Sequence, residues 1–400
     1  MLATIPRLCS GRPHEIDEIL RSAVDANDVP GVVAMAATDR EVVYGGAYGK
    51  RDLSKAADVT LDTVFWIASM TKAVTAAAAM RLIELERMDL EQPVGELLPE
   101  LASPLVLEGF NEQGMPRLRP AKRAVRVRHL LTHTSGFTYD IWDHNTGRYE
   151  KYAGLPTVAT CKNAALRTPL AFDPGDRWEY GISIDWLGKV IEAVTGQSLD
   201  VHLREQIFAP LGMKDTTFVI TPGQRSRLAV VHARKADGSL EPTPFEMPQN
   251  PEFYMGGGGL YATASDYLSF QRMLLNGGSF NGARILKPQT VAQMARNQIG
   301  KLNVGALKTM IRESSNDVDF FPGMKKKWGF SFLINTKRGP AGRSAGTLSW
   351  GGLGNTYFWI DPSERVAGVI MMQILPFADA KALRLYSDFE KGVYKRTASA

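Results

Sequence analysis

The first part of the chain switches between helical and strand-like patterns of apolar positions. Apolar residues recur every three or four positions over 14–27 and predict a helix that ends before a Pro-Gly pair. Two runs rich in β-branched residues, 32–38 and 42–48, surround a short polar turn and predict a β-hairpin. Over 67–87 the spacing is helical again, but apolar residues occupy most faces, so this helix should be buried.

The middle of the chain has mainly helical periodicity, and strand-like runs return near its end. Helical spacing extends over 129–220, and Thr263 is a suitable cap for a helix running to Leu275. The clearest middle helices are expected at 184–194 and 199–208. The later β-like runs are 328–334, 356–360 and 366–373, and an amphipathic helix is expected at 378–394.

Strands therefore occupy both ends of the chain and helices the middle. We predict an α/β (α+β) fold with a largely antiparallel sheet, terminal helices packed on it, and a mainly helical lobe. The expected domains are a discontinuous sheet domain, 1–66 and 225–400, and a helical domain, 67–224. A doubly wound parallel sheet would alternate strand and helix throughout, which this pattern does not do.

Composition and charge exclude several classes of protein. The 400 residues are 44% apolar and 22% charged, which excludes disordered, collagen-like and coiled-coil chains. The net charge of +5 comes with basic clusters at 117–128 and 325–327. Because the first cluster contains no aromatic residue, we expect a solvated surface loop and no nucleic-acid partner.

The amino terminus has no secretion-signal core, and no apolar run approaches the roughly 20 residues needed to cross a bilayer. We expect a cytoplasmic protein without a membrane partner, in which Cys9 and Cys161 are free thiols. No cysteine or histidine cluster suggests a metal site.

Two serine motifs compete as the candidate nucleophile. Gly342 to Gly346 matches the GxSxG elbow of α/β-hydrolases around Ser344, but that motif requires a histidine later in the chain. All six histidines precede Ser344, so we interpret the match as coincidental. Ser69 and Lys72 form the other motif, SxxK, at the start of the buried helix.

The SxxK spacing puts Lys72 one turn from Ser69 on the same helix face. Unpaired N–H groups at a helix start favour developing negative charge. Burial lowers the pKa of a lysine, so that its neutral amine can accept a proton from the serine hydroxyl. A serine cap followed by a surface lysine is the alternative explanation of the motif alone.

Four stretches together resemble the serine β-lactamase and penicillin-binding-protein superfamily, most closely the class C β-lactamase-like esterases called family VIII carboxylesterases. Their order and spacing extend the resemblance over most of the chain. The stretches are Phe-Trp-Ile-Ala-Ser-Met-Thr-Lys at 65–72, His-Leu-Leu-Thr-His-Thr-Ser-Gly at 129–136, Pro-Gly-Asp-Arg-Trp-Glu-Tyr at 174–180 and Leu-Ser-Trp-Gly-Gly at 348–352.

The resemblance implies a catalytic set of Ser69 as nucleophile, Lys72 as its proton partner and Tyr180 as the third member, in a site between the two lobes. A tyrosinate or a proton shared between Lys72 and Tyr180 would activate the serine. The sequence departs from the family's Tyr-x-Asn pattern, since Tyr180 is followed by Gly and Ile. The esterases of the family tolerate this change.

A second departure lies where lactamases carry Lys-Thr-Gly beside the site. Here the matching residues are Trp350, Gly351 and Gly352, which we expect to border the substrate pocket. Loss of the lysine argues for neutral esters and against a dedicated lactamase, and a turn between strands is the structural alternative. The resemblance also implies an oxyanion hole formed by the backbone N–H groups of Ser69 and Leu353.

Other conspicuous residues are interpreted as structural. His129 and His133 lie four apart, but no HExxH pattern accompanies them, and the matching segment packs the helical lobe in the family. Cys161 is expected in the core, and the glycine run 256–259 is expected to form a tight loop. The aromatic candidates for lining the pocket are Trp66, Tyr139, Trp142 and Tyr254.

The sequence thus predicts a serine carboxylesterase for small or short-chain acyl esters, with weak cephalosporin hydrolysis as a side activity. No metal or cofactor is implied, and the expected partner is a small-molecule ester. Three alternatives stay open: an acyltransferase, a D-amino-acid peptidase or β-lactamase of the same superfamily, and a non-catalytic binding relative.

Overall fold

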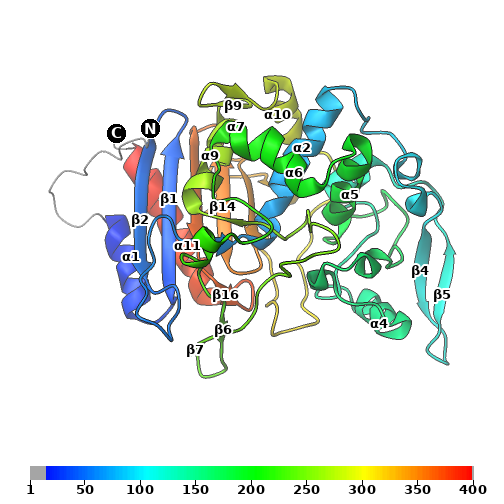
Figure 1. Cartoon of the computed structure of the whole chain (residues 1–400), viewed down its shortest axis with the longest axis horizontal. Helices are drawn as coiled ribbons and strands as arrows, with labels where there is room; N and C mark the ends of the chain where they lie inside the picture. The colour runs from blue at the N-terminus through cyan, green and yellow to red at the C-terminus, as the bar shows by residue number, and fades with distance from the viewer. Residues whose placement is uncertain (1–14, 399–400) are drawn as a thin grey trace.

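The centre of the fold is a seven-stranded antiparallel sheet (Figure 1). The computed structural model describes residues 15–398. The strand order is β11-β12-β13-β14-β15-β1-β2, so strands from both ends of the chain share one sheet, as the sequence pattern predicts. The strands are β1 (Gly31–Thr38), β2 (Val42–Gly49), β11 (Lys326–Trp328), β12 (Leu333–Asn335), β13 (Leu348–Gly352), β14 (Thr356–Asp361) and β15 (Val366–Met371).

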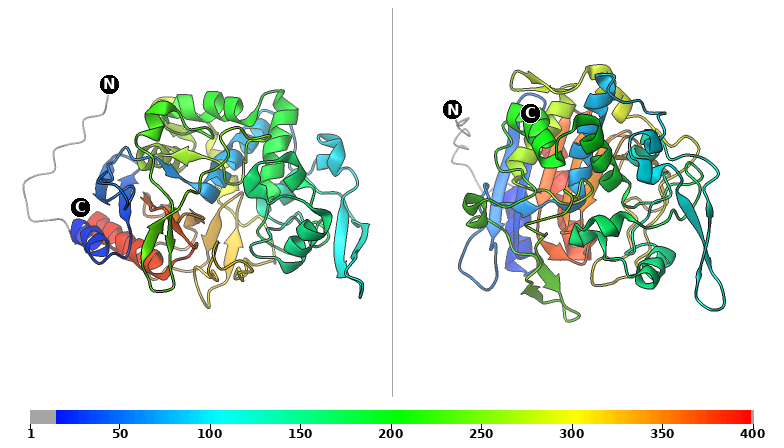
Figure 2. Two further views of the ribbon diagram at one scale, coloured as in Figure 1. Left: turned by 60° about the horizontal axis from the view of Figure 1, so that its bottom comes forward. Right: turned by 45° about the vertical axis from the view of Figure 1, so that its right-hand side comes forward.

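Helices cover both faces of this sheet. Side chains alternate between the two faces of a strand, and β14 uses this alternation to bind a helix on each side. The Trp359 ring packs on Phe389 of α11 (Ala380–Ala398) with centroids 5.6 Å apart, whereas the neighbouring Phe358 packs on Tyr267 of α9 (Ala264–Leu275) at 5.2 Å. The terminal helix α1 (Glu15–Asp25) lies beside α11 (Figures 1 and 2).

Several of the remaining helices form a lobe beside the sheet, in which α5 packs against α2, α3 and α6. The helices not yet given are α2 (Thr71–Glu84), α3 (Val127–Thr132), α4 (His144–Ala153), α5 (Ser183–Thr195), α6 (Leu199–Leu203), α7 (Ala209–Leu211), α8 (Pro222–Arg225), α10 (Pro288–Met294), a π-helical turn η6 (Arg204–Phe208) and the 3₁₀ turns η1 (Ala68–Met70), η2 (Val94–Glu96), η3 (Pro99–Leu101), η4 (Val158–Thr160) and η5 (Asn163–Leu166). The domain boundaries stay a prediction.

The short strands form separate small sheets. They are β3 (Phe65–Trp66), β4 (Leu105–Phe110), β5 (Pro116–Pro120), β6 (His232–Arg234), β7 (Leu240–Pro242), β8 (Tyr261–Ala262), β9 (Ser279–Phe280), β10 (Ala283–Arg284) and β16 (Ile374–Leu375).

Two local predictions are corrected by the structure. The run 328–334 is not one strand: β11 ends at Trp328 and β12 begins at Leu333, because Ser331 has a φ of 68° and turns the chain into a hairpin. The basic segment near Pro116 and Pro120 is not a loop but strand β5, which pairs with β4 in a hairpin that projects from the lobe (Figures 1 and 2).

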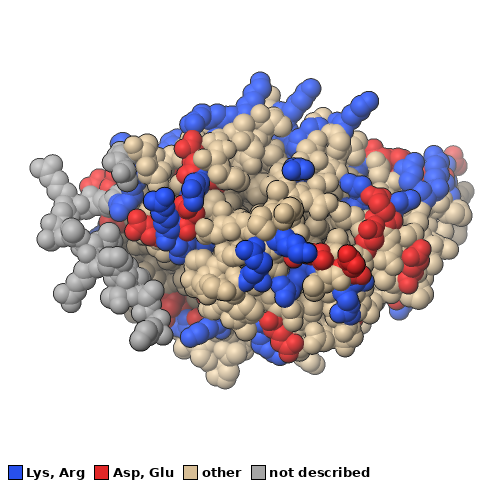
Figure 3. All heavy atoms as spheres, turned by 90° about the horizontal axis from the view of Figure 1, so that it is seen from above, with Lys and Arg blue, Asp and Glu red and all other residues tan. Residues whose placement is uncertain are grey.

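The basic clusters are largely neutralised by neighbouring acids. Arg119 bonds to both Glu108 and Asp173 at 2.7 Å. Lys326, in the second cluster, is buried and pairs with Asp319. On the face seen in Figure 3, Lys and Arg are spread over the surface and several lie beside Asp or Glu. None of the helices within residues 15–398 has the length and apolarity to span a membrane.

Candidate active site

Ser69 lies at a sharp turn between strand β3 and helix α2. The turn is the 3₁₀ element η1, and its first residue, Ala68, has a φ of 43°, a strained value for a residue with a side chain. The Trp66 indole N–H donates to the Gly258 carbonyl at 2.7 Å and fixes the chain entering the turn. Ser69 therefore stands directly before a buried helix, close to the position that the sequence pattern predicts.

Lys72 points back to Ser69, as the SxxK spacing predicts. Its Nζ lies 3.2 Å from Ser69 Oγ, 2.9 Å from the Tyr139 hydroxyl and 2.6 Å from the Gly257 carbonyl oxygen. Burial lowers the pKa of Lys72 to about 7, and the charge of Asp185 opposes this shift. Burial therefore makes the neutral amine more accessible than it is for an exposed lysine.

A buried carboxylate that sequence reasoning missed supports this arrangement. Asp185 on α5 accepts a hydrogen bond from the Gly257 N–H at 2.8 Å, and the carbonyl oxygen of the same residue accepts from Lys72. Burial raises the pKa of Asp185 to about 6, while Lys72, the Gly257 N–H and Tyr139 stabilise its charged form. A Cβ at Gly257 would lie 2.5 Å from Asp185 Oδ2, so the loop needs glycine there.

The glycine run 256–259 forms a tight loop, as expected, but it also belongs to the site. The Gly257 carbonyl oxygen accepts a hydrogen bond from Lys72. The Gly256 carbonyl oxygen accepts one from Thr75 Oγ1 at 2.8 Å. The sequence signals that could have identified these groups are the four consecutive glycines and an acidic residue five positions after Tyr180.

Tyr180 completes the group around Ser69. Its hydroxyl interacts with Ser69 and accepts a hydrogen bond from the Trp350 indole N–H at 2.9 Å. Burial raises the pKa of Tyr180, so the phenol is neutral. Its ring lies over Lys72, with Nζ 4.6 Å from the centroid. The Trp350 side chain on strand β13 thus contacts the hydroxyl of Tyr180 directly.

Strand β13 comes close to the nucleophile turn because of its glycines. A Cβ at Gly352 would lie 2.3 Å from the Ile67 carbonyl oxygen, and one at Gly351 would lie 2.7 Å from the Tyr357 ring. Ser69 and Leu353 line the same cavity, and neither backbone N–H is hydrogen-bonded within the described residues. These two N–H groups are thus available for the predicted oxyanion hole.

The cavity beside Ser69 has a volume of about 260 Å³ and mainly apolar walls. Trp66, Tyr139 and Trp142 line it, as predicted, but Tyr254 does not and packs on Phe218 instead. Trp350, Gly351 and Gly352, which the sequence predicts at the pocket border, do not line this cavity either. The sequence analysis did not identify the other apolar wall residues, which include Phe245, Met247, Met255, Ile311 and Leu375. Among the described residues no Arg, Lys or His lines this cavity, and Asp140 contributes a carboxyl group.

The remaining candidates lie outside the reacting group. Ser344 Oγ bonds to Glu364 at 3.2 Å, and no histidine accompanies it. The His133 ring packs on Tyr180 with centroids 4.7 Å apart, while His129 Nδ1 accepts from the Arg126 N–H.

No group of three or more His, Cys, Asp or Glu side chains suited to a metal occurs in the described part of the chain. Cys161 is buried, and burial raises the pKa of its thiol to about 12. Cys9 lies outside the described residues.

The sequence model of the beta-lactamase family matches residues 16–391, nearly the whole chain. The chain belongs to the beta-lactamase family. This confirms the resemblance to the serine β-lactamase and penicillin-binding-protein superfamily, and the antiparallel sheet with helices is the fold of that superfamily.

Individual relatives carry out ester chemistry. The chain is 30% identical to the monacolin J acid methylbutanoyltransferase of Aspergillus terreus, over 95% of each protein. It is 29% identical to the lovastatin esterase of Penicillium rubens, over 95% of this chain and 98% of the relative. A mutant of simvastatin synthase (LovD) from Aspergillus terreus has a TM-score of 0.84 and 28% identity, covering 96% of this chain and 95% of that one. The family is thus one of serine hydrolases and acyltransferases.

Proposed function

We propose that this chain is a serine carboxylesterase that acts through an acyl-enzyme on Ser69. The observation that carries the proposal is the placement of Lys72 Nζ between Ser69 Oγ, the Tyr139 hydroxyl and the Gly257 carbonyl. This geometry gives the serine a buried base, which is the requirement for an activated nucleophile.

The hydrogen-bond partners of Lys72 fix the direction of proton transfer. A neutral amine has two N–H donors and one lone pair. The Gly257 carbonyl can only accept, and the Tyr139 hydroxyl accepts while its own proton faces the Asp185 carboxylate. Both donors are then used, and the lone pair is left for the proton of Ser69.

Tyr180 serves the leaving group. Because burial keeps its phenol neutral and Trp350 donates to its oxygen, its own proton is directed to Ser69 Oγ. This favours a proton shared with Lys72 over a tyrosinate. Ser69 Oγ bonds to the ester carbonyl carbon as its proton moves to Lys72, and the oxyanion accepts from the N–H groups of Ser69 and Leu353.

The C–O bond to the alcohol then breaks, and the alkoxide takes the proton held by Lys72, passed through Tyr180. Water enters the emptied position, gives one proton back to Lys72 and attacks the acyl carbon. The bond to Ser69 Oγ breaks, the serine recovers its proton from Lys72, and the carboxylic acid is released.

The cavity favours neutral, apolar acyl esters of small or short-chain acids. Its walls are aromatic and aliphatic, and Asp140 disfavours an anionic substrate. No cation among the described wall residues would hold the carboxylate of a β-lactam. These features support the resemblance to the family VIII carboxylesterases, with β-lactam hydrolysis as a weak side activity.

Transfer of the acyl group to an alcohol is the second candidate. The relatives named for acyl transfer and for ester hydrolysis are almost equally similar to this chain, at 30% and 29% identity. Either acceptor, water or alcohol, uses the same acyl-enzyme. Hydrolysis of p-nitrophenyl butyrate in the presence of a competing alcohol separates the two, because a transferase forms the new ester in preference to the free acid.

Labelling with a serine-reactive phosphonate tests the proposal, with mass mapping of the adduct. We expect the adduct on Ser69, its loss in Ser69→Ala and in Lys72→Ala, and its retention in the matched control Ser344→Ala. An adduct on Ser344, or none, would overturn the proposal. Turnover of p-nitrophenyl butyrate should far exceed turnover of nitrocefin, and the reverse ranking would identify a lactamase.

A further inference from the structure

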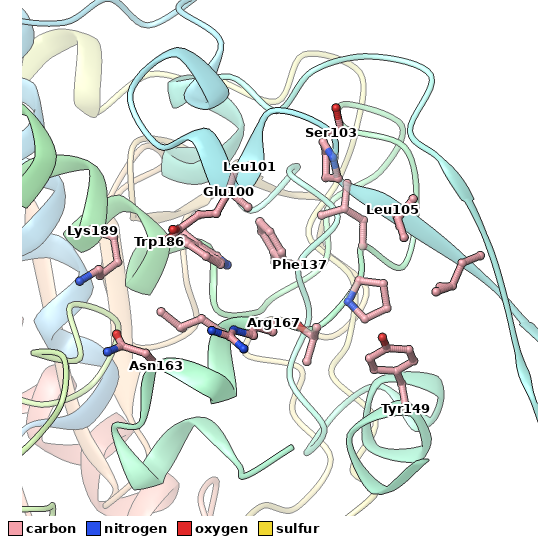
Figure 4. A pocket seen from close by; sticks show the side chains of 16 residues that line it. Glu100, Leu101, Ser103, Leu105, Phe137, Tyr149, Asn163, Arg167, Trp186 and Lys189 are labelled. Carbon is pink, nitrogen blue, oxygen red and sulfur yellow. The ribbon is translucent and has the colours of Figure 1, made fainter. Parts of the chain in front are cut away.

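A second cavity, of about 510 Å³, lies within the helical lobe (Figure 4). Its walls come from η3, β4, α4, η5 and α5, and it shares no wall residue with the cavity beside Ser69. Its wall combines polar and apolar groups in similar measure, and a concave site that holds both kinds of group can bind a small molecule. Neither the proposed reaction nor the fold explains this cavity.

Apolar groups form much of its wall. The rings of Phe137 and Trp186 stack with centroids 5.8 Å apart. Leu105 and Leu118, from the projecting β4–β5 hairpin, line the same cavity although they are 42% and 38% exposed. An alkyl chain laid across these side chains would remove apolar surface from water, at roughly 25 cal/mol per Å².

The polar groups of the wall are mainly donors. The Arg167 guanidinium is exposed and makes no ion pair within the described residues. The Trp186 indole N–H and the Thr168 hydroxyl are buried and have no hydrogen-bond partner among residues 15–398. Figure 4 shows the indole nitrogen of Trp186 directed toward the interior of the cavity, with Arg167 below it. An anionic head group with several acceptor oxygens matches this set.

The other charged wall residues orient such a ligand. Lys189 adds a second cation, although it is already paired with Glu192 at 2.9 Å. Glu100 lines the opposite side of the cavity from Arg167 (Figure 4) and would repel the head group. The anion is therefore confined to the Arg167 side, and its apolar part lies against Phe137 and the leucines.

We propose that this cavity binds an amphipathic monocarboxylate, with its carboxylate on Arg167 and its hydrocarbon body against Trp186, Phe137, Leu105 and Leu118. A planar guanidinium holds a carboxylate through two parallel hydrogen bonds, which a neutral head group cannot reproduce. The binding does not depend on the reaction proposed for Ser69. The occupant lies against α5, the helix that carries Asp185.

Calorimetric titration with octanoate tests the proposal on the whole chain. We expect wild type to bind octanoate and Arg167→Gln to bind it at least tenfold more weakly. Arg296→Gln is the matched control, because Arg296 is also exposed and unpaired within the described residues but lies outside the cavity. Its affinity for octanoate should stay within twofold of wild type.

Octan-1-ol provides the matched ligand, since it has the same chain without the charge. Its affinity should be the same for wild type and Arg167→Gln. Equal octanoate affinity in wild type and Arg167→Gln would place the ligand elsewhere, for example beside Ser69, and would overturn the proposal. The absence of octanoate binding to wild type would overturn it as well. Ester hydrolysis by Arg167→Gln should match wild type and shows that the variant is folded.

Discussion

The substitution Trp350→Phe removes the hydrogen bond from Trp350 to Tyr180 and keeps an aromatic ring, although it also removes part of the buried side-chain volume. The indole N–H lies 2.9 Å from the tyrosine hydroxyl, and both side chains are buried. If this bond directs the Tyr180 proton to Ser69, its loss should lower kcat more than it changes KM, because the proton is needed in the transition state.

The size of the effect follows from burial. A buried acceptor left without its donor typically costs about 1–3 kcal/mol. Tyr180 keeps its interaction with Ser69, so we expect the lower part of this range, about 1–2 kcal/mol. At 1.36 kcal/mol per factor of ten, kcat should fall about 5- to 30-fold.

Trp328→Phe is the matched control for this prediction. Trp328 is fully buried in the same aromatic cluster, with its ring centroid 4.7 Å from that of Trp350, but its indole N–H has no hydrogen-bond partner. Both variants therefore lose the same volume, and only one loses a bond to Tyr180. Steady-state hydrolysis of p-nitrophenyl butyrate compares them, and an equal fall in kcat in the two variants would refute the reasoning.

Three further substitutions test other buried groups. Asp185→Asn removes a charge that raises the pKa of Lys72. Because the proposed mechanism uses the neutral amine, the acid limb of the kcat/KM–pH profile should move to lower pH, and an unmoved limb would contradict this. Gly257→Ala forces a Cβ to within 2.5 Å of Asp185, so urea unfolding should show a loss of about 1–3 kcal/mol and activity should fall at least about tenfold. Glu390→Gln leaves the buried Arg343 without its charge partner and should lower the free energy of unfolding by about 3–5 kcal/mol. The kcat of the folded enzyme should stay unchanged, and a fall in kcat would link this pair to the site.

Local patterns predicted much of the secondary structure, because helical and strand periodicity depend on near neighbours. The hairpin of β1 and β2, the helix α5 and the Thr263-capped helix α9 all form where expected. The prediction of one strand over 328–334 was wrong because a single residue, Ser331, turns the chain, and apolar content alone does not indicate such a turn. The β4–β5 hairpin was missed because its two prolines are tolerated only on an exposed edge.

The sequence by itself brought together the two residues that we propose as nucleophile and base. Ser69 and Lys72 are three residues apart, so the geometry of one helical turn brings their side chains together. The motifs also placed Tyr180 and the Trp350 strand in the same site, through their resemblance to a family and not through local physics.

Only the tertiary structure decided how Lys72 is held. Its partners Tyr139 and Gly257 lie 67 and 185 positions away in the sequence, and Asp185 reaches Gly257 across 72 positions. Such contacts form when α2, α5 and the glycine loop pack together, and no periodicity records them. The charge state of Lys72 depends on this burial and on the nearby carboxylate, so the property on which the proposed mechanism depends is set by packing.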